Sequence, residues 1–516
     1  MNKFKNCHFL GITICIISAI SIFYLGMEVY PYTSPDSMYD YLGMGEKILN
    51  NGFIWYFTNY GMAPPLFACL IAGLISLGVP PIEASQLIVV TSFALIIFPV
   101  YYIGKELGDD ILGILCVLFI STFPLVWVFG LTIWTEILFI LFSMTSIVFF
   151  IRYYKDNSLL YLILSALFVS LVSLSRYPGI FLVIAGIIII LLKQKFFDDS
   201  FNKMRIILFG SISIIPITII LIRNKLIKSD YYAGDWQWIE NTGFINENHR
   251  MLNWIFNDTI ITPLKNFTSL FPPHSFLIFL IFILLCLIFI LFSLHLAYNK
   301  NVSIELLKIL YRNSLSITVF LIVYIGFFLL IYCALQGYGG EQRYMQAIAP
   351  LLTIFIIINI YTFIGSIKIK KYKICMGLLF FLILSSIMIG NILESKTLYN
   401  NFYQGSGYTS PFYHNNEGIK YLLSSNTSSN IHVNSIYENA VRYQLGRPVT
   451  LLPFSSNNNT EIYNYLDFIP KGDYMLILKM NDERVLNKSF ISQYNLIRKK
   501  FSMLVDYPDS SIFVST

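Results

Sequence analysis

A short run that begins at Ser34 combines residue types that could hold a reactive carboxylate at the start of a helix. Ser34 suits a helix N-cap and Pro35 suits the first helical position, so Asp36 is predicted to lie in the first turn. Asp40 follows one turn later on the same face. An ionised carboxylate held there is suited to act as a general base. The alternative is that Asp36 only stabilises the helix N-terminus.

Three further charged residues stand beside apolar stretches, where a charge is costly and usually has a partner. Glu136 opens one apolar run, and its alternative role is that of an interfacial carboxylate that reaches water. Arg176 and Arg343, the latter followed by Tyr344, could bind a phosphate group through the guanidinium fork. Both arginines could instead extend their side chains to the lipid headgroups.

Aromatic residues gather in the segment 223–275, where Trp236 and Trp238 lie close to Asp235. Aromatic rings with nearby acids suit contact with a sugar or a lipid, and an aromatic belt at the membrane interface is the alternative. The sequence has no His-Glu-x-x-His motif and no Walker loop. No cofactor is therefore predicted to be required, although a divalent metal would be compatible with the acidic residues.

The composition is typical of a membrane protein. Of the 516 residues, 56% are apolar and only 12% are charged, whereas soluble domains carry about 25% charged residues. These values exclude a cytosolic enzyme, a disordered chain and a fibrous protein. The net charge of +6 is spread over short loops rather than gathered on one face, so a nucleic-acid partner is also excluded.

Charge-poor runs of about 20 residues, long enough to cross the hydrocarbon, recur along most of the chain. We predict eleven, at 9–27, 86–104, 111–130, 133–151, 159–175, 178–192, 206–222, 276–298, 315–335, 345–365 and 374–392. The sequence Ser175-Arg176-Tyr177-Pro178 favours two spans rather than one broken helix at 159–192. The apolar stretch from Pro64 to Gly78 is too short to cross and is predicted to be re-entrant or interfacial.

The loop charges predict which side each loop occupies. With the N-terminus in the cytoplasm, the inner loops hold roughly twice as many Lys and Arg residues as the outer loops. The long loops 28–85 and 223–275 and the polar tail then lie outside a cell membrane. We expect residues 1–392 to form a transmembrane catalytic domain and residues 393–516 an extracytoplasmic α/β domain. The fold class is thus an α-helical polytopic membrane protein with a small C-terminal α/β domain.

The order of several sequence pieces resembles the GT-C superfamily, the glycosyltransferases that use polyprenyl-phosphate sugars. The resemblance is to the protein O-mannosyltransferase, aminoarabinose transferase and lipopolysaccharide-sugar transferase branches. The pieces are Ser34-Pro35-Asp36 to Gly45, Ala63-Pro64-Pro65-Leu66-Phe67, Phe98-Pro99-Val100-Tyr101-Tyr102, Pro124, Glu136, Gln342-Arg343-Tyr344 with Pro350, and Tyr443-Gln444-Leu445-Gly446-Arg447-Pro448-Val449. They cover residues 1–365 well and the tail loosely.

The resemblance implies an inverting transfer of one sugar from a polyprenyl phosphate to a hydroxyl group. The acceptor would be a protein, lipid or glycan at the membrane. Asp36 would be the base, Glu136 would position the acceptor or a cation, and Arg343, then Arg176, would meet the phosphate charge. Asp40, Tyr344 and Trp236 complete the predicted substrate-binding set. The alternatives are a lipid-linked glycan ligase or polymerase, and a flippase or transporter.

Overall fold

The computed structural model describes the chain in segments that fall into two compact units. The described residues are 2–33, 37–59, 63–197, 202–228, 237–238, 317–325, 335–336, 347–367, 369–404, 413, 415–425, 429–434, 438–445, 449–452, 465–478, 488–508 and 510–515. One unit comprises Met1–Glu28 and Tyr39–Asn400, and the other comprises Val29–Met38 and Asn401–Thr516. Each unit is described by itself.

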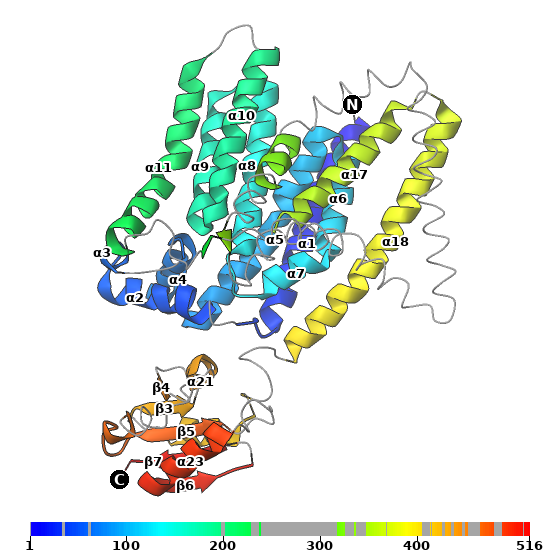
Figure 1. Cartoon of the computed structure of the whole chain (residues 1–516). Coiled ribbons are helices and arrows are strands. Elements are labelled where there is room, and N and C mark those ends of the chain that lie inside the picture. Colours follow the sequence, from blue (N-terminus) through cyan, green and yellow to red (C-terminus); the bar gives the residue numbers. More distant parts are fainter. Residues whose placement is uncertain are drawn as a thin grey trace. The chain divides into compact units, whose positions relative to one another are not determined.

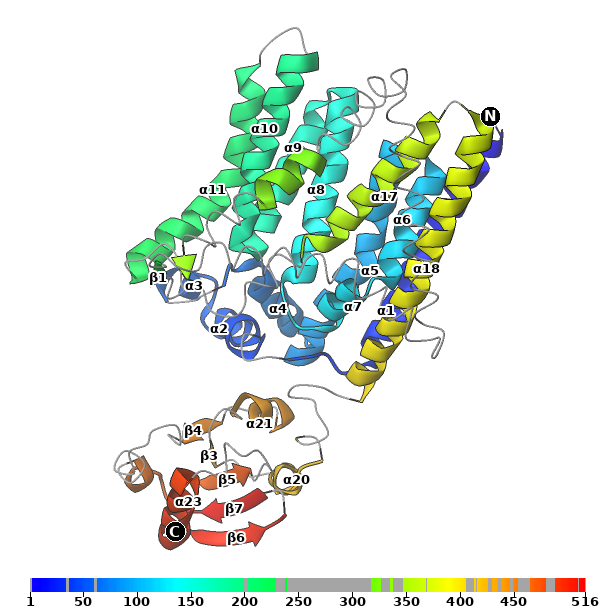
Figure 2. The same ribbon diagram turned by 45° about the vertical axis from the view of Figure 1, so that its right-hand side comes forward.

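The first unit is a bundle of apolar helices (Figures 1 and 2). Its elements are α1 (Asn2–Glu28), the π-helical turn η1 (Ser37–Leu42), α2 (Gly43–Asn51), α3 (Ile54–Thr58), α4 (Leu66–Ser76), α5 (Pro81–Leu107), α6 (Asp110–Thr122), α7 (Pro124–Leu131), α8 (Glu136–Asp156), α9 (Leu159–Ser175), the 3₁₀ turn η2 (Tyr177–Gly179), α10 (Ile180–Phe197), α11 (Lys203–Lys228), α17 (Ala349–Ser366) and α18 (Lys370–Tyr403). The short strands β1 (Gln237–Trp238) and β2 (Leu335–Gln336) pair antiparallel.

Helices cover most of the described residues of the predicted apolar runs. Within the described residues, five helices are long and apolar enough to cross a membrane: Cys7–Glu28, Pro81–Leu107, Glu136–Asp156, Lys203–Ile227 and Lys370–Tyr403. The shorter apolar helices include Leu159–Ser175, Tyr177–Lys193 and Ala349–Gly365. The predicted run 276–298 lies outside the described residues, and the run 315–335 is described as a helix at 317–325. The chain therefore has a multi-pass, α-helical membrane fold.

The run 111–130, predicted as a single span, is bent by 60° between α6 and α7. Pro124 is the first residue of α7, and Phe123 before it is extended, as steric contact with a following proline demands. The break leaves carbonyl groups without helical partners. Trp127 Nε1 donates to the Ser121 carbonyl at 2.8 Å, and Ser395 Oγ of α18 donates to the Thr122 carbonyl at 2.9 Å. These two hydrogen bonds satisfy the carbonyl groups at the break, which lie inside the apolar bundle.

The predicted break before Pro178 is confirmed. Helix α9 ends at Ser175, and Arg176 is extended, with φ −152° and ψ 139°. The turn η2 then leads into α10. The two apolar runs on either side are therefore separate helices.

The second unit contains a mixed β-sheet with helices (Figure 2). Its elements are α20 (Glu417–Ser424), β3 (Ile431–Asn434), α21 (Glu438–Leu445), β4 (Thr450–Leu452), β5 (Tyr474–Leu478), α23 (Lys488–Lys500), β6 (Ser502–Asp506) and β7 (Ser510–Val514). The described strands form a five-stranded sheet in the order β4-β3-β5-β7-β6. Strand β3 is parallel to β4 and β5, while β7 is antiparallel to β5 and β6. The small C-terminal α/β domain expected from the sequence is confirmed.

The core of this sheet lies between its strands and α23. Met475, Ile477 and Phe513 from the sheet pack with Ile497 and Phe501 from α23 and the residue that follows it. Helix α23 is not among the elements predicted from the sequence. Its side chains are mostly polar, and three basic residues stand in its last turn.

Candidate functional site

Two residues singled out from the sequence form an ion pair inside the bundle. The Arg176 guanidinium contacts the Glu136 carboxylate, and the two side chains are 6% and 0% exposed. Glu136 comes from the first residue of α8, and Arg176 follows the last residue of α9. A carboxylate at this depth is stabilised by a partner of opposite charge.

The helix ends explain why each charge stands where it does. Helices α8 and α9 follow one another across a short connection and pack antiparallel, so the start of α8 lies beside the end of α9 (Figure 1). The amino end of a helix favours a negative charge, and its carboxyl end favours a positive charge. Glu136 and Arg176 each satisfy this rule on their own helix, and the two helix ends bring them together.

A second buried arginine fixes the segment around α3 to the same end of the bundle. Arg223 of α11 is 4% exposed. Its Nε donates to the Tyr56 carbonyl at 2.9 Å, and another guanidinium nitrogen donates to the Asn59 carbonyl. The guanidinium also lies 4.2 Å from the centre of the Tyr56 ring. Arg223 therefore holds the segment around α3 by hydrogen bonds and a cation–π contact.

Asn224 connects this arginine to the turn that carries Arg176. Arg223 Nη1 donates to Asn224 Oδ1 at 2.6 Å, and Asn224 Nδ2 donates to the Tyr177 hydroxyl at 2.9 Å. Tyr177 directly follows Arg176 in the chain. The end of α11 thus supports the backbone next to the ion pair.

Tyr56 is buried under this arrangement and stays a neutral hydrogen-bond donor. Burial raises the pKa of the Tyr56 phenol well above its ordinary value, since the charged form would lose its solvation. Its hydroxyl donates to the Ala63 carbonyl at 3.3 Å. The phenol therefore links α3 to the chain entering α4.

The short helices α2 and α4 form a packed platform at this end. Met44 and Ile48 of α2 pack with Ala68 and Ala72 of α4 and with Ile217 of α11. Gly45 lets the two short helices approach closely, because a Cβ there would lie 2.9 Å from Ile71 Cγ2 and 3.1 Å from the Ala68 carbonyl oxygen. The predicted re-entrant or interfacial segment Pro64–Gly78 is thus the short helix α4, packed rather than spanning.

The structure places the remaining predicted site residues as follows. Asp40 lies in η1 and is half-buried. Asp36, Trp236, Arg343 and Tyr344 lie outside the described residues. Among the described residues, no group of three or more His, Cys, Asp and Glu side chains could hold a metal ion.

Sequence reasoning missed the supporting residues Arg223, Asn224 and Tyr177 as parts of this site. In the sequence, Arg223 is one of several basic residues that follow the apolar run 206–222 and would be placed in a loop. Hydropathy does not indicate that α11 continues beyond that run. The available signal was an arginine directly at the end of an apolar run, followed by an asparagine. Both are costly to bury unless they are bonded.

Comparisons with known proteins agree with this architecture. Residues 62–222 match the family model of dolichyl-phosphate-mannose-protein mannosyltransferase. That range includes α4, Glu136, Arg176 and most of α11. No curated protein matches the chain.

Two solved structures share the fold over almost the whole length. The crystal structure of ArnT from Cupriavidus metallidurans in the apo state is 9% identical, covers 98% of each chain and gives a TM-score of 0.59. The structure of ArnT from the same organism bound to undecaprenyl phosphate is 10% identical, covers 98% of each chain and gives a TM-score of 0.60. At these identities the likeness is one of fold.

The segment around Glu136 and Arg176 therefore matches a mannosyltransferase family model, the chain has the ArnT fold, and its resemblance to the GT-C superfamily is confirmed.

Proposed function

We propose that this chain is an integral-membrane glycosyltransferase. It moves a single sugar from a polyprenyl-phosphate donor to a hydroxyl acceptor on the extracytoplasmic face of the cell membrane, with inversion at the anomeric carbon. The acceptor belongs to a lipid, glycan or protein. The family match over residues 62–222 and the fold shared with an undecaprenyl-phosphate-bound protein support the class of reaction and of donor.

The chemical step needs one base and one stabilised leaving group. The acceptor oxygen forms a bond to the anomeric carbon while the bond from that carbon to the phosphate oxygen breaks. Asp36 takes the acceptor proton, and the polyprenyl phosphate leaves with the electron pair of the broken bond. Asp40, one helical turn away in the sequence, contributes to substrate binding with Tyr344 and Trp236.

Fixed cations stabilise the negative charge that grows on the departing phosphate. Arg343 has this role first and Arg176 second. The Arg176 side chain is held by Glu136, so its guanidinium is oriented before the substrate arrives. Glu136 thus has one of two roles. It either orients Arg176 toward the phosphate or positions the acceptor. No metal is required in this scheme, because arginine supplies the positive charge.

One observation carries the proposal most directly, namely the buried pair of Glu136 and Arg176 within the family-matched segment. The direct test uses the purified full chain, a synthetic polyprenyl-phosphate sugar and a hydroxyl acceptor. Transfer of one sugar, with inverted configuration by NMR and unchanged turnover after chelation of divalent metals, is the expected result. Transfer of a preassembled glycan chain would instead identify a ligase or polymerase, and lipid translocation without transfer would identify a flippase.

The proposed orientation has its own test. The N-terminus and the basic segment 368–373 are cytoplasmic in this proposal, and residues 28–85, 223–275 and 393–516 are outside. Cysteine labelling or reporter fusions should place these three regions on one face, opposite Lys373. A cytoplasmic tail would overturn the proposed face of reaction.

A further inference from the structure

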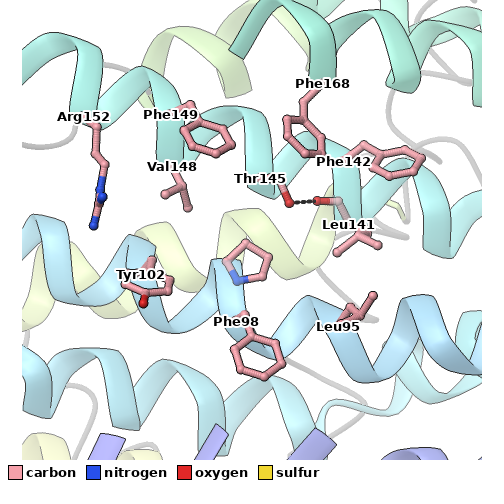
Figure 3. A pocket seen from close by; sticks show the side chains of 11 residues that line it. Leu95, Phe98, Tyr102, Leu141, Phe142, Thr145, Val148, Phe149, Arg152 and Phe168 are labelled. Carbon is pink, nitrogen blue, oxygen red and sulfur yellow. Dashed lines mark hydrogen bonds between the residues drawn. The ribbon is translucent and has the colours of Figure 1, made fainter. Parts of the chain in front are cut away.

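An apolar groove runs along the bundle between α5, α8 and α9, away from the Glu136 end of α8. Its volume is about 490 Å³, and its walls carry Phe98, Phe142, Phe149 and Phe168. Figure 3 shows Arg152 and Tyr102 at one end of the groove and Leu141 and Phe142 at the other. The four Phe side chains are half-buried, so the groove opens to the surface of the described bundle.

Among the described residues that line the groove, Arg152 is the charged one, and it belongs to a cluster with excess positive charge. Arg152 contacts Glu106 at 3.1 Å, and Lys155 contacts the other oxygen of the same carboxylate at 2.9 Å. The Arg152 guanidinium also lies 5.6 Å from the centre of the Tyr102 ring. Two cations thus share one carboxylate at the mouth of an apolar groove.

Two more cations gather around the same end of α8. Lys193 donates to the Tyr153 carbonyl and to Asn157 Oδ1, both at 2.8 Å. Arg205 contacts the Tyr153 hydroxyl at 3.4 Å and also bonds Asn157. Among the described residues at this end of α8, the cations outnumber the carboxylates even when Asp156, the last residue of α8, is added to Glu106. The local potential therefore favours an anion.

The length of the groove matches one leaflet of a bilayer. Leu141 and Arg152 mark its two ends on α8, and eleven residues of helix span roughly 16 Å. Half of the hydrocarbon core is about 15 Å thick. An acyl chain that ends at mid-membrane fits this length, whereas a polyprenyl chain would extend beyond the Leu141 end of the groove.

We propose that this groove binds an anionic glycerophospholipid, with one acyl chain between α5, α8 and α9 and its phosphate beside Arg152. The lipid belongs to the leaflet at the Arg152 end of α8, which is the cytoplasmic leaflet in the predicted topology. The site lies at the opposite end of α8 from Glu136, and it is independent of the proposed transfer reaction.

The test measures which lipid stays with the full chain. The protein is reconstituted in nanodiscs of equal parts phosphatidylcholine and phosphatidylglycerol, released, and examined by native mass spectrometry. We expect retained phosphatidylglycerol to exceed phosphatidylcholine by about fivefold, the effect of one cation near a lipid phosphate. Equal retention of the two lipids would overturn the proposal.

Two variants distinguish the site of the acyl chain from the site of the lipid phosphate. Thr145→Trp fills the groove wall and should abolish lipid retention, while Leu167→Trp, on the exposed face of α9 outside the groove, should not. Arg152→Gln should keep a lipid but lose the preference for phosphatidylglycerol, and Lys155 still pairs with Glu106. If Thr145→Trp does not fold, Thr145→Leu is used in its place. Its smaller side chain fills less of the groove, and we expect weaker lipid retention than in the unchanged protein. Equal retention by the Thr145 variant and Leu167→Trp would contradict the site.

A competition experiment identifies the source of the phosphate. Undecaprenyl phosphate added to the same nanodiscs should leave the retained phosphatidylglycerol unchanged. Displacement that depends on Arg152 would show that the groove holds the polyprenyl carrier instead and would overturn the assignment to a glycerophospholipid.

Discussion

Arg176, directly after the carboxyl end of α9, forms an ion pair with Glu136 at the amino end of α8, and both side chains are buried. The pair adds an ionic contact to the packing of α8 against α9, at the ends of the two helices farthest from the loop that joins them. Removing one partner leaves an uncompensated charge in a dry site, which typically costs about 3–5 kcal/mol. The pair therefore has a structural effect that can be measured apart from its proposed part in catalysis.

We expect Arg176→Gln to destabilise the protein strongly and the double variant Arg176→Gln with Glu136→Gln to recover part of that loss. The double variant removes both charges, so no lone carboxylate stays buried. Thermal unfolding midpoints of the purified variants measure this difference. Turnover should stay low in both, since the oriented guanidinium is absent in both. Full turnover in the double variant would limit the pair to a structural role.

The proposed base is tested by Asp36→Asn, which preserves size and much of the hydrogen bonding but cannot accept the proton. Loss of a general base typically lowers the rate by about 10²–10⁴-fold. Turnover and the thermal midpoint are measured in parallel, and we expect only turnover to fall. Asp40→Asn is the matched control, one turn along the same segment. An equal loss in both variants would indicate a shared acidic or metal site, and normal turnover in Asp36→Asn would rule out this base.

The leaving group is tested at Arg343. Arg343→Lys retains a positive charge but loses the planar fork that bonds a phosphate through two nitrogens. We expect a substantial loss of turnover with normal membrane insertion, measured with the synthetic donor. Arg343→Ala with full activity would move the principal phosphate role to Arg176.

Arg223→Lys should loosen the segment around α3. A single ammonium group cannot reproduce the donations to the carbonyls of Tyr56 and Asn59, and charged hydrogen bonds contribute about 1.5–3 kcal/mol each. Hydrogen exchange of residues 53–59 should become faster. Leu226→Ala, at an 81% exposed position on the same helix, is the control and should leave the exchange unchanged. Unchanged exchange in Arg223→Lys would show that α3 is held by packing alone.

Two glycine substitutions test how closely α2 packs against α4. Gly45→Ala places a methyl group against Ile71 and the Ala68 carbonyl, and overpacking of this kind costs typically about 1–3 kcal/mol. Gly73→Ala lies on α4 with no atom within 4 Å of the new Cβ, so it should be neutral or stabilising. Thermal midpoints compare the two variants. Similar midpoints would mean that α2 shifts away from α4 without loss of stability.

The sequence predicts the helices of the bundle better than their geometry. Apolar length locates α5, α8 and α11, and the Arg176-Tyr177-Pro178 break separates α9 from α10, because these signals are local. The angle between α6 and α7 was not predicted. Hydropathy is the same for a straight and a bent apolar run, and one carbonyl group freed at the bend is bonded by Ser395, far along the chain.

The candidate site shows the same limit. Glu136 and Arg176 each stand out from the sequence as charges beside apolar runs, but their pairing depends on which helix ends meet in space. Arg223 and Asn224 act on backbone carbonyls and on Tyr177, and such partners have no sequence signature. In the second unit, α23 was not predicted. Most of its residues are polar, so the few apolar residues that enter the core, such as Ile497, give only a weak helical pattern.

The hydrogen bond from Ser395 to the carbonyl of Thr122 also imposes an order of assembly on the chain. The two residues are 273 positions apart, so the carbonyl at the α6–α7 break is synthesised long before its donor. Until α18 enters the bundle, that carbonyl must find water or another donor inside an apolar environment. The hydrogen bonding at the bend between α6 and α7 is therefore completed only after α18 is made, and a ribosome-bound chain that stops before Ser395 lacks this bond.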